Sequence, residues 1–268
     1  MIKFVIGLVG WGLFCGYINN YFLLGCYLLY YAFRVKLFHL AFWLIKDLFV
    51  FISDIATGKY FKRYYGIYGV VGEYGQGKGV ALAHQYTDII KPRKLFGRYI
   101  HNPDNYIFIS NCYMKGCTSF ETLADVMKFY NEAMSSGKGL VVFWDEIQNE
   151  FPENDRNFPP QFRFLLTQNR KLRGVRIVWT SQDYTRVNKN IRLMTTSVRH
   201  MRTYFKRYTI EKVYKRFVYE DLYNTTDIRQ RVRKIPQKIN IIVQTDKLRD
   251  CFNSFEILDS AKKISGLK

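Results

Sequence analysis

A short apolar segment that runs directly into a glycine-rich loop is the strongest constraint in this sequence. The segment is "YYGIYGVV", Tyr64–Val71, and the chain continues as "GEYGQGKGVALA", Gly72–Ala83. Gly72, Gly77 and Lys78 satisfy the G-x-x-x-x-G-K spacing of a phosphate-binding loop. A strand, this loop and a helix beginning near Lys78 form the context that the motif requires. The pattern predicts an α/β domain with a nucleotide site.

The loop is expected to bind the phosphates of ATP mainly through its backbone. Glycines let consecutive backbone N–H groups turn toward phosphate oxygens, and the dipole of the following helix adds to the attraction. The side chain of Lys78 would reach the β- and γ-phosphates. The residues predicted to contact the nucleotide are Gly72, Glu73, Tyr74, Gly75, Gln76, Gly77, Lys78, Gly79 and Val80.

Gly79 departs from the usual form of this loop, which has serine or threonine there. Without that hydroxyl, one ligand of Mg²⁺ has to come from water or from another side chain. A glycine-rich structural turn is the alternative interpretation of the loop taken alone.

A second apolar run ends in two carboxylates. The stretch "GLVVFWDEIQNEFP", Gly139–Pro152, is continuously apolar from Leu140 to Trp144, as is typical of a strand buried on both faces. Asp145 is predicted to hold Mg²⁺ through water, and Glu146 to orient or deprotonate the attacking water. The alternative is a buried strand that ends in two exposed acids.

A third strand is expected in "GVRIVWTSQDY", Gly174–Tyr184, which is apolar to Trp179 and then polar. Gln182 is the residue predicted to sense the γ-phosphate from this strand end. Between the second and third strands, "PPQFRFLLTQNRKLRG" has helix-like apolar spacing between Pro160 and Gly174.

The N-terminal end is apolar enough to enter a membrane. No charged residue occurs from Phe4 to Phe33, and a helix of that length would span roughly 45 Å, against about 30 Å of hydrocarbon in a bilayer. Leu37–Ala56 is also apolar but contains Lys46 and Asp47, which favours an interfacial helix over a second span. We expect residues 1–57 to form a membrane anchor, 58–235 an ATPase domain and 236–268 a C-terminal extension. On either topology the basic cluster that follows should be cytoplasmic: Lys59, Lys62 and Arg63.

The formal net charge of +19 predicts an anionic partner, either nucleic acid or a membrane surface. After Arg199, basic residues alternate with aromatic ones, a composition suited to phosphate contact and base stacking with single-stranded DNA. A solvated sheet face is the alternative. The five cysteines show neither a C-x-x-C pair nor a matching histidine cluster, which argues against a disulfide framework or a zinc site.

The stretches "LVVFWDEIQNEFP" and "TQNRKLRGVRIVWTSQDYTRVNKNIR" resemble the zonular occludens toxin-like family, which includes assembly ATPases of filamentous phages. The order of motifs is also similar to the wider HerA/FtsK superfamily, in which a loop ending "GKGV" has a precedent. The resemblance implies a RecA-like, mostly parallel sheet flanked by helices. It further implies a homo-oligomeric ring, with a hexamer expected, in which Arg173 or Arg192 acts on the neighbouring subunit's site.

The function implied is a host inner-membrane ATPase, with its catalytic domain in the cytoplasm, that drives filamentous phage assembly and extrusion with ATP and Mg²⁺. Its partners would be single-stranded DNA, coat protein or both. Two departures from the family are the position of the apolar span before the ATPase domain and Asn169–Arg170–Lys171 in place of a His-rich motif. Two other functions remain open: a DNA-translocating or conjugative coupling ATPase, and a non-hydrolysing membrane assembly scaffold.

Overall fold

The structure is a computed structural model of the 268-residue chain. It describes residues 21–34, 36–57, 64–95, 97–155, 157–170, 174–224 and 235–253, together with Gly10 and Leu13. The chain divides into two compact units, Met1–Tyr60 and Phe61–Lys268. The predicted boundary between residues 57 and 58 lies close to this division.

The first unit contains the helices α2 (Tyr21–Arg34) and α3 (Leu37–Ala56), with Lys36 in the left-handed conformation between them. Most apolar side chains of α3 are exposed. Among the helices in the described ranges, none combines the length and the apolar content that crossing a membrane needs. Most of the predicted span before Tyr21, and the basic cluster from Lys59 to Arg63, lie outside the described residues, so the anchor stays a prediction.

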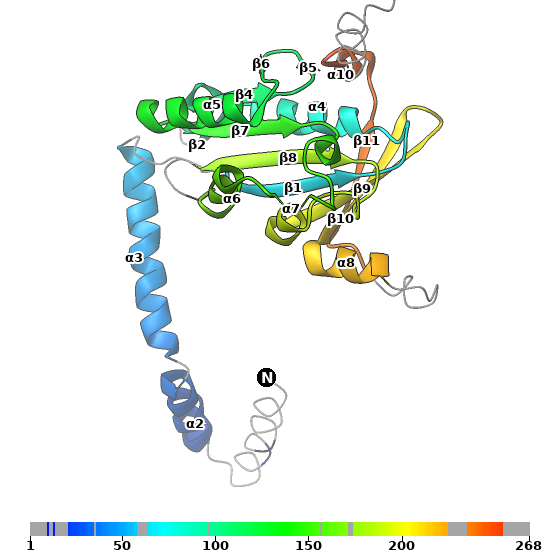
Figure 1. Ribbon diagram of the computed structural model, residues 1–268. Coiled ribbons are helices and arrows are strands. Elements are labelled where there is room, and N and C mark those ends of the chain that lie inside the picture. Colours follow the sequence, from blue (N-terminus) through cyan, green and yellow to red (C-terminus); the bar gives the residue numbers. More distant parts are fainter. Residues whose placement is uncertain are drawn as a thin grey trace, which may run out of the picture. The chain divides into compact units, whose positions relative to one another are not determined.

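The second unit is built on one eight-stranded sheet with the order β11-β10-β9-β1-β8-β7-β4-β6 (Figure 1). Six neighbouring strands, from β9 to β6, are parallel, and β10 and β11 are added antiparallel at one side. The predicted α/β class with a mostly parallel sheet is thereby confirmed. The strands are β1 (Gly66–Val71), β4 (Tyr106–Ser110), β6 (Thr118–Ser119), β7 (Gly139–Trp144), β8 (Val175–Ser181), β9 (Ser197–Tyr204), β10 (Tyr208–Lys215) and β11 (Lys238–Val243).

Helices cover both faces of this sheet. The helix α4 (Lys78–Ile89) packs on one face through the cluster that contains Leu82, Val141 and Val178. The other face is covered by α5 (Leu123–Ser136), α6 (Pro160–Thr167), α7 (Lys189–Met194) and α8 (Arg216–Asn224). The remaining short elements are β2 (Arg93–Leu95), β3 (Arg98–His101), β5 (Tyr113–Met114), β12 (Phe252–Asn253), the 3-10 turns η1 (Pro103–Asn105) and η2 (Ile147–Asn149), and α10 (Asp246–Arg249).

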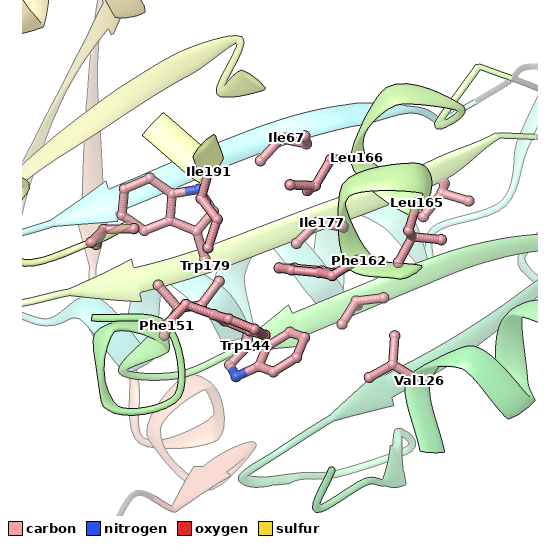
Figure 2. Close-up of a cluster of buried hydrophobic side chains, with 14 of the residues drawn as sticks. Ile67, Val126, Trp144, Phe151, Phe162, Leu165, Leu166, Ile177, Trp179 and Ile191 are labelled. Atoms are coloured by element: carbon pink, nitrogen blue, oxygen red, sulfur yellow. The ribbon is translucent and has the colours of Figure 1, made fainter. Parts of the chain in front are cut away.

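The largest core cluster explains why the central strands are apolar throughout. Every residue of β7 is buried, because helices or loops cover it on both sides. Trp144 packs against the rings of Phe151 and Phe162, with centroids 5.3 and 5.4 Å away (Figure 2). Trp179 of β8 contributes a second fully buried indole to the same cluster. Burying rings of this size stabilises the sheet by roughly 1.5–3 kcal/mol per side chain, which fixes the position of the strand ends.

Two segments differ from the local patterns of the sequence. The stretch "IEKVYKRFVYEDLY", Ile210–Tyr223, alternates roughly as a strand would, but the strand β10 ends at Lys215, because the chain turns into α8 at Arg216. The residues of the predicted C-terminal extension are also part of the second unit. The strand β11 pairs with β10, and β12 pairs with β5.

Candidate functional site

The glycine-rich loop follows β1 without an intervening residue and leads directly into α4. Gly75 and Gly77 both have positive φ, 73° and 79°, a conformation that costs energy for residues with a side chain. A Cβ on Gly77 would also come within 2.8 Å of Gln244 Nε2. The helix begins at Lys78, so its first free N–H groups point back into the loop. The backbone thus has the shape that a phosphate-binding loop needs.

The amine of Lys78 lies in a ring of oxygen atoms. Its Nζ donates to the carbonyls of Gly72 at 2.9 Å and Glu73 at 3.2 Å, and lies 3.6 Å from Glu146 Oε1. The Lys78 side chain is only 8% exposed. A buried ammonium group without counter-charges is strongly unfavourable. The structure therefore joins the loop and the end of β7 through one buried charge.

Asp145 follows β7, and its carboxylate is held by the neighbouring strand. The hydroxyl of Thr180, in β8, donates to Asp145 Oδ1 at 2.5 Å. Burial raises the pKa of Asp145, and the nearby charge of Glu146 raises it further, while the Thr180 hydroxyl and Lys78 act in the opposite direction. A cation beside Asp145 would lower that pKa again.

The backbone of Asp145 is held by Asn111, which directly follows β4. Asn111 Oδ1 accepts from the Asp145 N–H at 2.7 Å, and Asn111 Nδ2 donates to the Asp145 carbonyl at 2.9 Å. Asn111 and Thr180 were missed by sequence reasoning. Both lie at or just beyond the ends of parallel strands, where polar residues of an open α/β sheet meet, and that position is the signal that could have found them.

Glu146 has an unusual backbone conformation, with φ at 50°. Its N–H donates to Thr180 Oγ1 at 2.8 Å, and its Oε2 accepts a hydrogen bond from Gln148 Nε2. Left-handed backbone at a residue other than glycine costs energy and persists only where surrounding contacts fix it. Here those contacts turn the Glu146 carboxylate toward Lys78.

Phe252 occupies the space beside Gly79. A Cβ added to Gly79 would lie 2.0 Å from Cε1 of the Phe252 ring, far below any real contact distance. Phe252 belongs to β12 and packs on the α4 side of the sheet. Packing therefore explains why residue 79 is a glycine rather than a serine or threonine. The Phe252 ring fills the space that a side chain at residue 79 would need.

The loop is also attached to β9. The pairing between β1 and β9 ends at Val71 and His200, and β9 continues to Tyr204 along the side of the loop. The backbone N–H of Thr203 donates to Gln76 Oε1 at 2.6 Å. The hydroxyl of Thr203 lies 2.8 Å from that of Thr209. A strand other than those predicted thus contacts the phosphate loop.

Two of the remaining predicted residues, Gln182 and Arg192, have other surroundings in the structure. Gln182 follows β8 and is half-buried, and among the described residues no hydrogen bond joins it to Lys78, Asp145 or Glu146. Arg192 Nη2 lies 2.9 Å from Glu153 Oε1, and its guanidinium lies over the ring of Tyr184. Arg173 is outside the described residues. Thr180, rather than Gln182, is the β8 residue that contacts the paired acids.

The donor atoms fit a magnesium–nucleotide complex. Mg²⁺ prefers oxygen ligands and is commonly held by one or two carboxylates together with substrate phosphates and water. Asp145 offers a carboxylate beside the Thr180 hydroxyl, and Lys78 offers a charge for phosphate. Within the described ranges, no three His, Cys, Asp or Glu side chains form a dedicated metal cage. The ion would accordingly depend on the nucleotide for part of its ligand shell.

Comparison with known proteins gives one family. The sequence profile described as "Zonular occludens toxin (Zot)" matches residues 107–248, more than half of the chain. The match includes Asp145, Glu146 and Thr180 but begins after the glycine-rich loop. No curated protein sequence matches significantly.

The solved structures that are similar to the chain include the following two. The N-terminal domain of zonular occludens toxin from Neisseria meningitidis is 17% identical, with 70% of this chain and 99% of that chain covered and a TM-score of 0.50. That likeness concerns the fold. The genome packaging NTPase B204 from Sulfolobus turreted icosahedral virus 2, in complex with AMPPCP, is 12% identical, with 68% and 98% covered and a TM-score of 0.43.

Proposed function

Because the chain belongs to the zonular occludens toxin family, we propose that it is a P-loop ATPase that acts in virion assembly. The observation that carries this proposal is the position of Lys78. Its buried amine is bound by the loop carbonyls of Gly72 and Glu73 and lies beside the carboxylate of Glu146, which follows β7, the second strand from β1 in the sheet. A structural turn has no need for a buried lysine that faces the carboxylate of Glu146.

ATP supplies the phosphoanhydride bond whose hydrolysis provides the energy. The loop N–H groups from Gly72 to Lys78 bind the phosphates, and the amine of Lys78 exchanges its carbonyl partners for phosphate oxygens. Asp145 and the hydroxyl of Thr180 would hold Mg²⁺, directly or through water, and the ion would offset the negative charge of the phosphates. Glu146 orients the attacking water and accepts its proton.

The finer form of the proposal is a membrane-anchored motor that assembles and extrudes a filamentous phage. The uncharged run from Phe4 to Phe33 provides the anchor. The net charge of +19 supports an anionic cargo, and single-stranded DNA, dressed with coat protein during export, is the cargo we propose. The working form is a homo-oligomeric ring.

Steady-state ATP hydrolysis by the full-length chain in mild detergent tests this function. We expect Mg²⁺-dependent turnover, with a loss of about 100-fold or more in Lys78→Ala because the charge that binds the transferred phosphoryl group is removed. Glu146→Gln should retain ATP binding but lose turnover. Lys91→Ala is the matched control, because this lysine is exposed just beyond the far end of α4 and forms an ion pair with Asp88.

The result also separates the competing functions. ATP binding without turnover in the parental chain would favour a non-hydrolysing assembly scaffold, for which the contact of Phe252 with Gly79 is the structural argument. Turnover at the parental rate in Glu146→Gln would contradict the role assigned to that carboxylate.

A further inference from the structure

A basic and aromatic groove lies on the opposite face of β9 from the contacts of the phosphate loop. The groove is a cavity of about 550 Å³ between β9, β10 and α8. It is lined by His200, Arg202, Tyr204, Ile210, Lys212, Tyr214, Tyr219, Leu222 and Tyr223. We name this set the β9–α8 groove.

The charged side chains that line the groove are all basic, and the carboxylate of Asp183, outside the lining set, accepts a hydrogen bond from the Tyr223 hydroxyl at 2.6 Å. The lining includes Arg202, Lys212 and the imidazole of His200, and it includes no carboxylate. Burial, together with the positive charges of Lys212 and Arg202, lowers the pKa of His200. Arg202 and Lys212 are exposed. Two cations that face solvent without an acid among the lining residues form a site for an anion such as a phosphodiester.

Tyrosine rings supply the second half of the site. Tyr214 and Tyr219 are buried and form its base, whereas Tyr204 and Tyr223 are 38% and 36% exposed. The guanidinium of Arg202 lies 5.5 Å from the centre of the Tyr204 ring. Exposed rings next to cations bind single-stranded nucleic acid, because bases stack on the rings while phosphates contact the cations. An anionic lipid surface would contact Arg202 and Lys212, but it would not reach the buried rings of Tyr214 and Tyr219 at the base of the groove.

The alternation of β9 connects the groove to the nucleotide site. Successive side chains of a strand point to opposite faces. Arg202 and Tyr204 line the groove, while Thr203 between them contacts Thr209 and, through its N–H, Gln76 of the phosphate loop. A movement of the loop on nucleotide binding would therefore act on the residues that line the groove.

We propose that the β9–α8 groove binds single-stranded nucleic acid, with Arg202 and Lys212 on the phosphates and Tyr204 stacked on a base. The choice of nucleic acid as the anion rests on the proposed function, whereas the site itself rests on the lining residues. The groove is distinct from the ATP site and lies on the other face of the same strand.

Fluorescence anisotropy of a labelled oligothymidylate with the full-length chain tests this site. Arg202→Ala combined with Lys212→Ala should weaken binding at least tenfold. The loss of two phosphate contacts should also reduce the slope of log K against log salt concentration by about 1.4. Tyr204→Ala should weaken binding by about 5- to 150-fold, and Tyr204→Phe should not, because the stacking ring is kept. The matched control is Lys206→Ala with Lys215→Ala, which removes the same charge outside the groove.

The same proteins are assayed for ATP hydrolysis, which separates the two proposals. Lys78→Ala should bind the oligonucleotide as the parental chain does, and the groove variants should keep basal hydrolysis. DNA binding without hydrolysis in the parental chain would remove the proposed function and leave the groove. Equal DNA affinity in the groove and control variants would overturn the groove. So would a parental chain that binds vesicles with anionic lipid through these residues but does not bind DNA.

Discussion

The backbone N–H of Thr203 donates to Gln76 Oε1 at 2.6 Å, and this contact joins the phosphate loop to β9. The Gln76 side chain thereby binds the part of β9 that extends beyond its pairing with β1. The bond uses the main chain of β9, so it depends on the position of the strand rather than on the identity of residue 203. Of its two partners, the Gln76 side chain is therefore the one that a substitution can remove.

Loss of the Gln76 acceptor should destabilise the second unit. Gln76→Ala leaves the Thr203 N–H without its partner, at a cost of about 1–3 kcal/mol. Gln76→Glu keeps an acceptor oxygen in place and is the control. Thermal unfolding of the two variants side by side measures the difference. Equal midpoints for Gln76→Ala and the parental chain would show that the bond contributes nothing.

A side chain at residue 79 should compete with Phe252. Gly79→Ser places a Cβ against the Phe252 ring, so we expect a lower unfolding midpoint and faster proteolysis of the C-terminal segment. Adding Phe252→Ala should be less costly in the Gly79→Ser background than in the parental chain. The coupling energy comes from a double-mutant cycle. Additive effects of the two substitutions would mean that the two residues do not share this space. The control is Phe205→Ala, at a ring that is 93% exposed.

Neutralising Asp145 should stabilise the ligand-free protein while weakening Mg²⁺-dependent ATP binding. The raised pKa means that folding disfavours the ionised carboxylate, so at pH 7 the ionised group reduces stability. Asp145→Asn removes this cost, and each kcal/mol gained should raise the unfolding midpoint by about 2–4 °C. The gain should shrink as the pH falls toward 3.8, the ordinary value, because the acid then becomes neutral as well.

Unfolding midpoints at a series of pH values, with Asp250→Asn as an exposed control, measure this effect. A destabilised Asp145→Asn variant at pH 7 would contradict it. ATP titrations with and without Mg²⁺ follow the second half of the prediction in the same samples.

Arg192 offers a test of a shared active site. Its ion pair with Glu153 holds it within its own subunit, so Glu153→Gln releases the arginine without removing it. If Arg192 acts on a neighbouring subunit, Arg192→Ala should lose ATP hydrolysis and Glu153→Gln should retain it. Mixing Arg192→Ala with Lys78→Ala subunits should then restore part of the activity, because some interfaces hold both intact parts. No recovery in assemblies confirmed by light scattering would assign Arg192 a purely structural role.

The proposed membrane anchor predicts that the second unit lies in the cytoplasm, and a cysteine at residue 62 tests this. In a background with Cys15, Cys26 and Cys251 replaced by serine, Lys62→Cys should resist an impermeant thiol reagent in intact cells and react after permeabilisation. Cys112 and Cys117 can stay, because burial raises the pKa of each thiol to about 12 and keeps it unreactive. Labelling in intact cells would place the unit outside the cell, away from ATP.

Local patterns were sufficient for the elements around the loop. The apolar run before Gly72 forms β1, the helix starts at Lys78, and the run that ends at Trp144 forms β7. These features depend on residues that are close in sequence. The hydrophobic periodicity, the positions of the glycines and the continuous apolar runs all indicate the same structure there. The α/β class followed from them.

Contacts between distant parts of the chain could not be predicted in this way. Thr203 lies 127 residues after Gln76, and Phe252 reaches Gly79 from the last described segment. Thr180 was within the predicted third strand, but the choice fell on Gln182 because periodicity does not say which polar residue at a strand end turns toward the neighbouring strand. The packing of side chains on both faces of the sheet determines which of these polar residues turns toward the neighbouring strand.

The alternation of β9 has a consequence for changing this protein by directed evolution. Arg202 and Tyr204 lie on the face away from the residues that contact the phosphate loop, and the contact between the strand and Gln76 uses only a main-chain N–H. A library randomised at residues 202, 204 and 212 would therefore vary what the groove accepts while the groups around Lys78 stay the same. If the groove binds nucleic acid, its ligand preference can therefore be varied separately from ATP hydrolysis, because the two sites lie on opposite faces of β9.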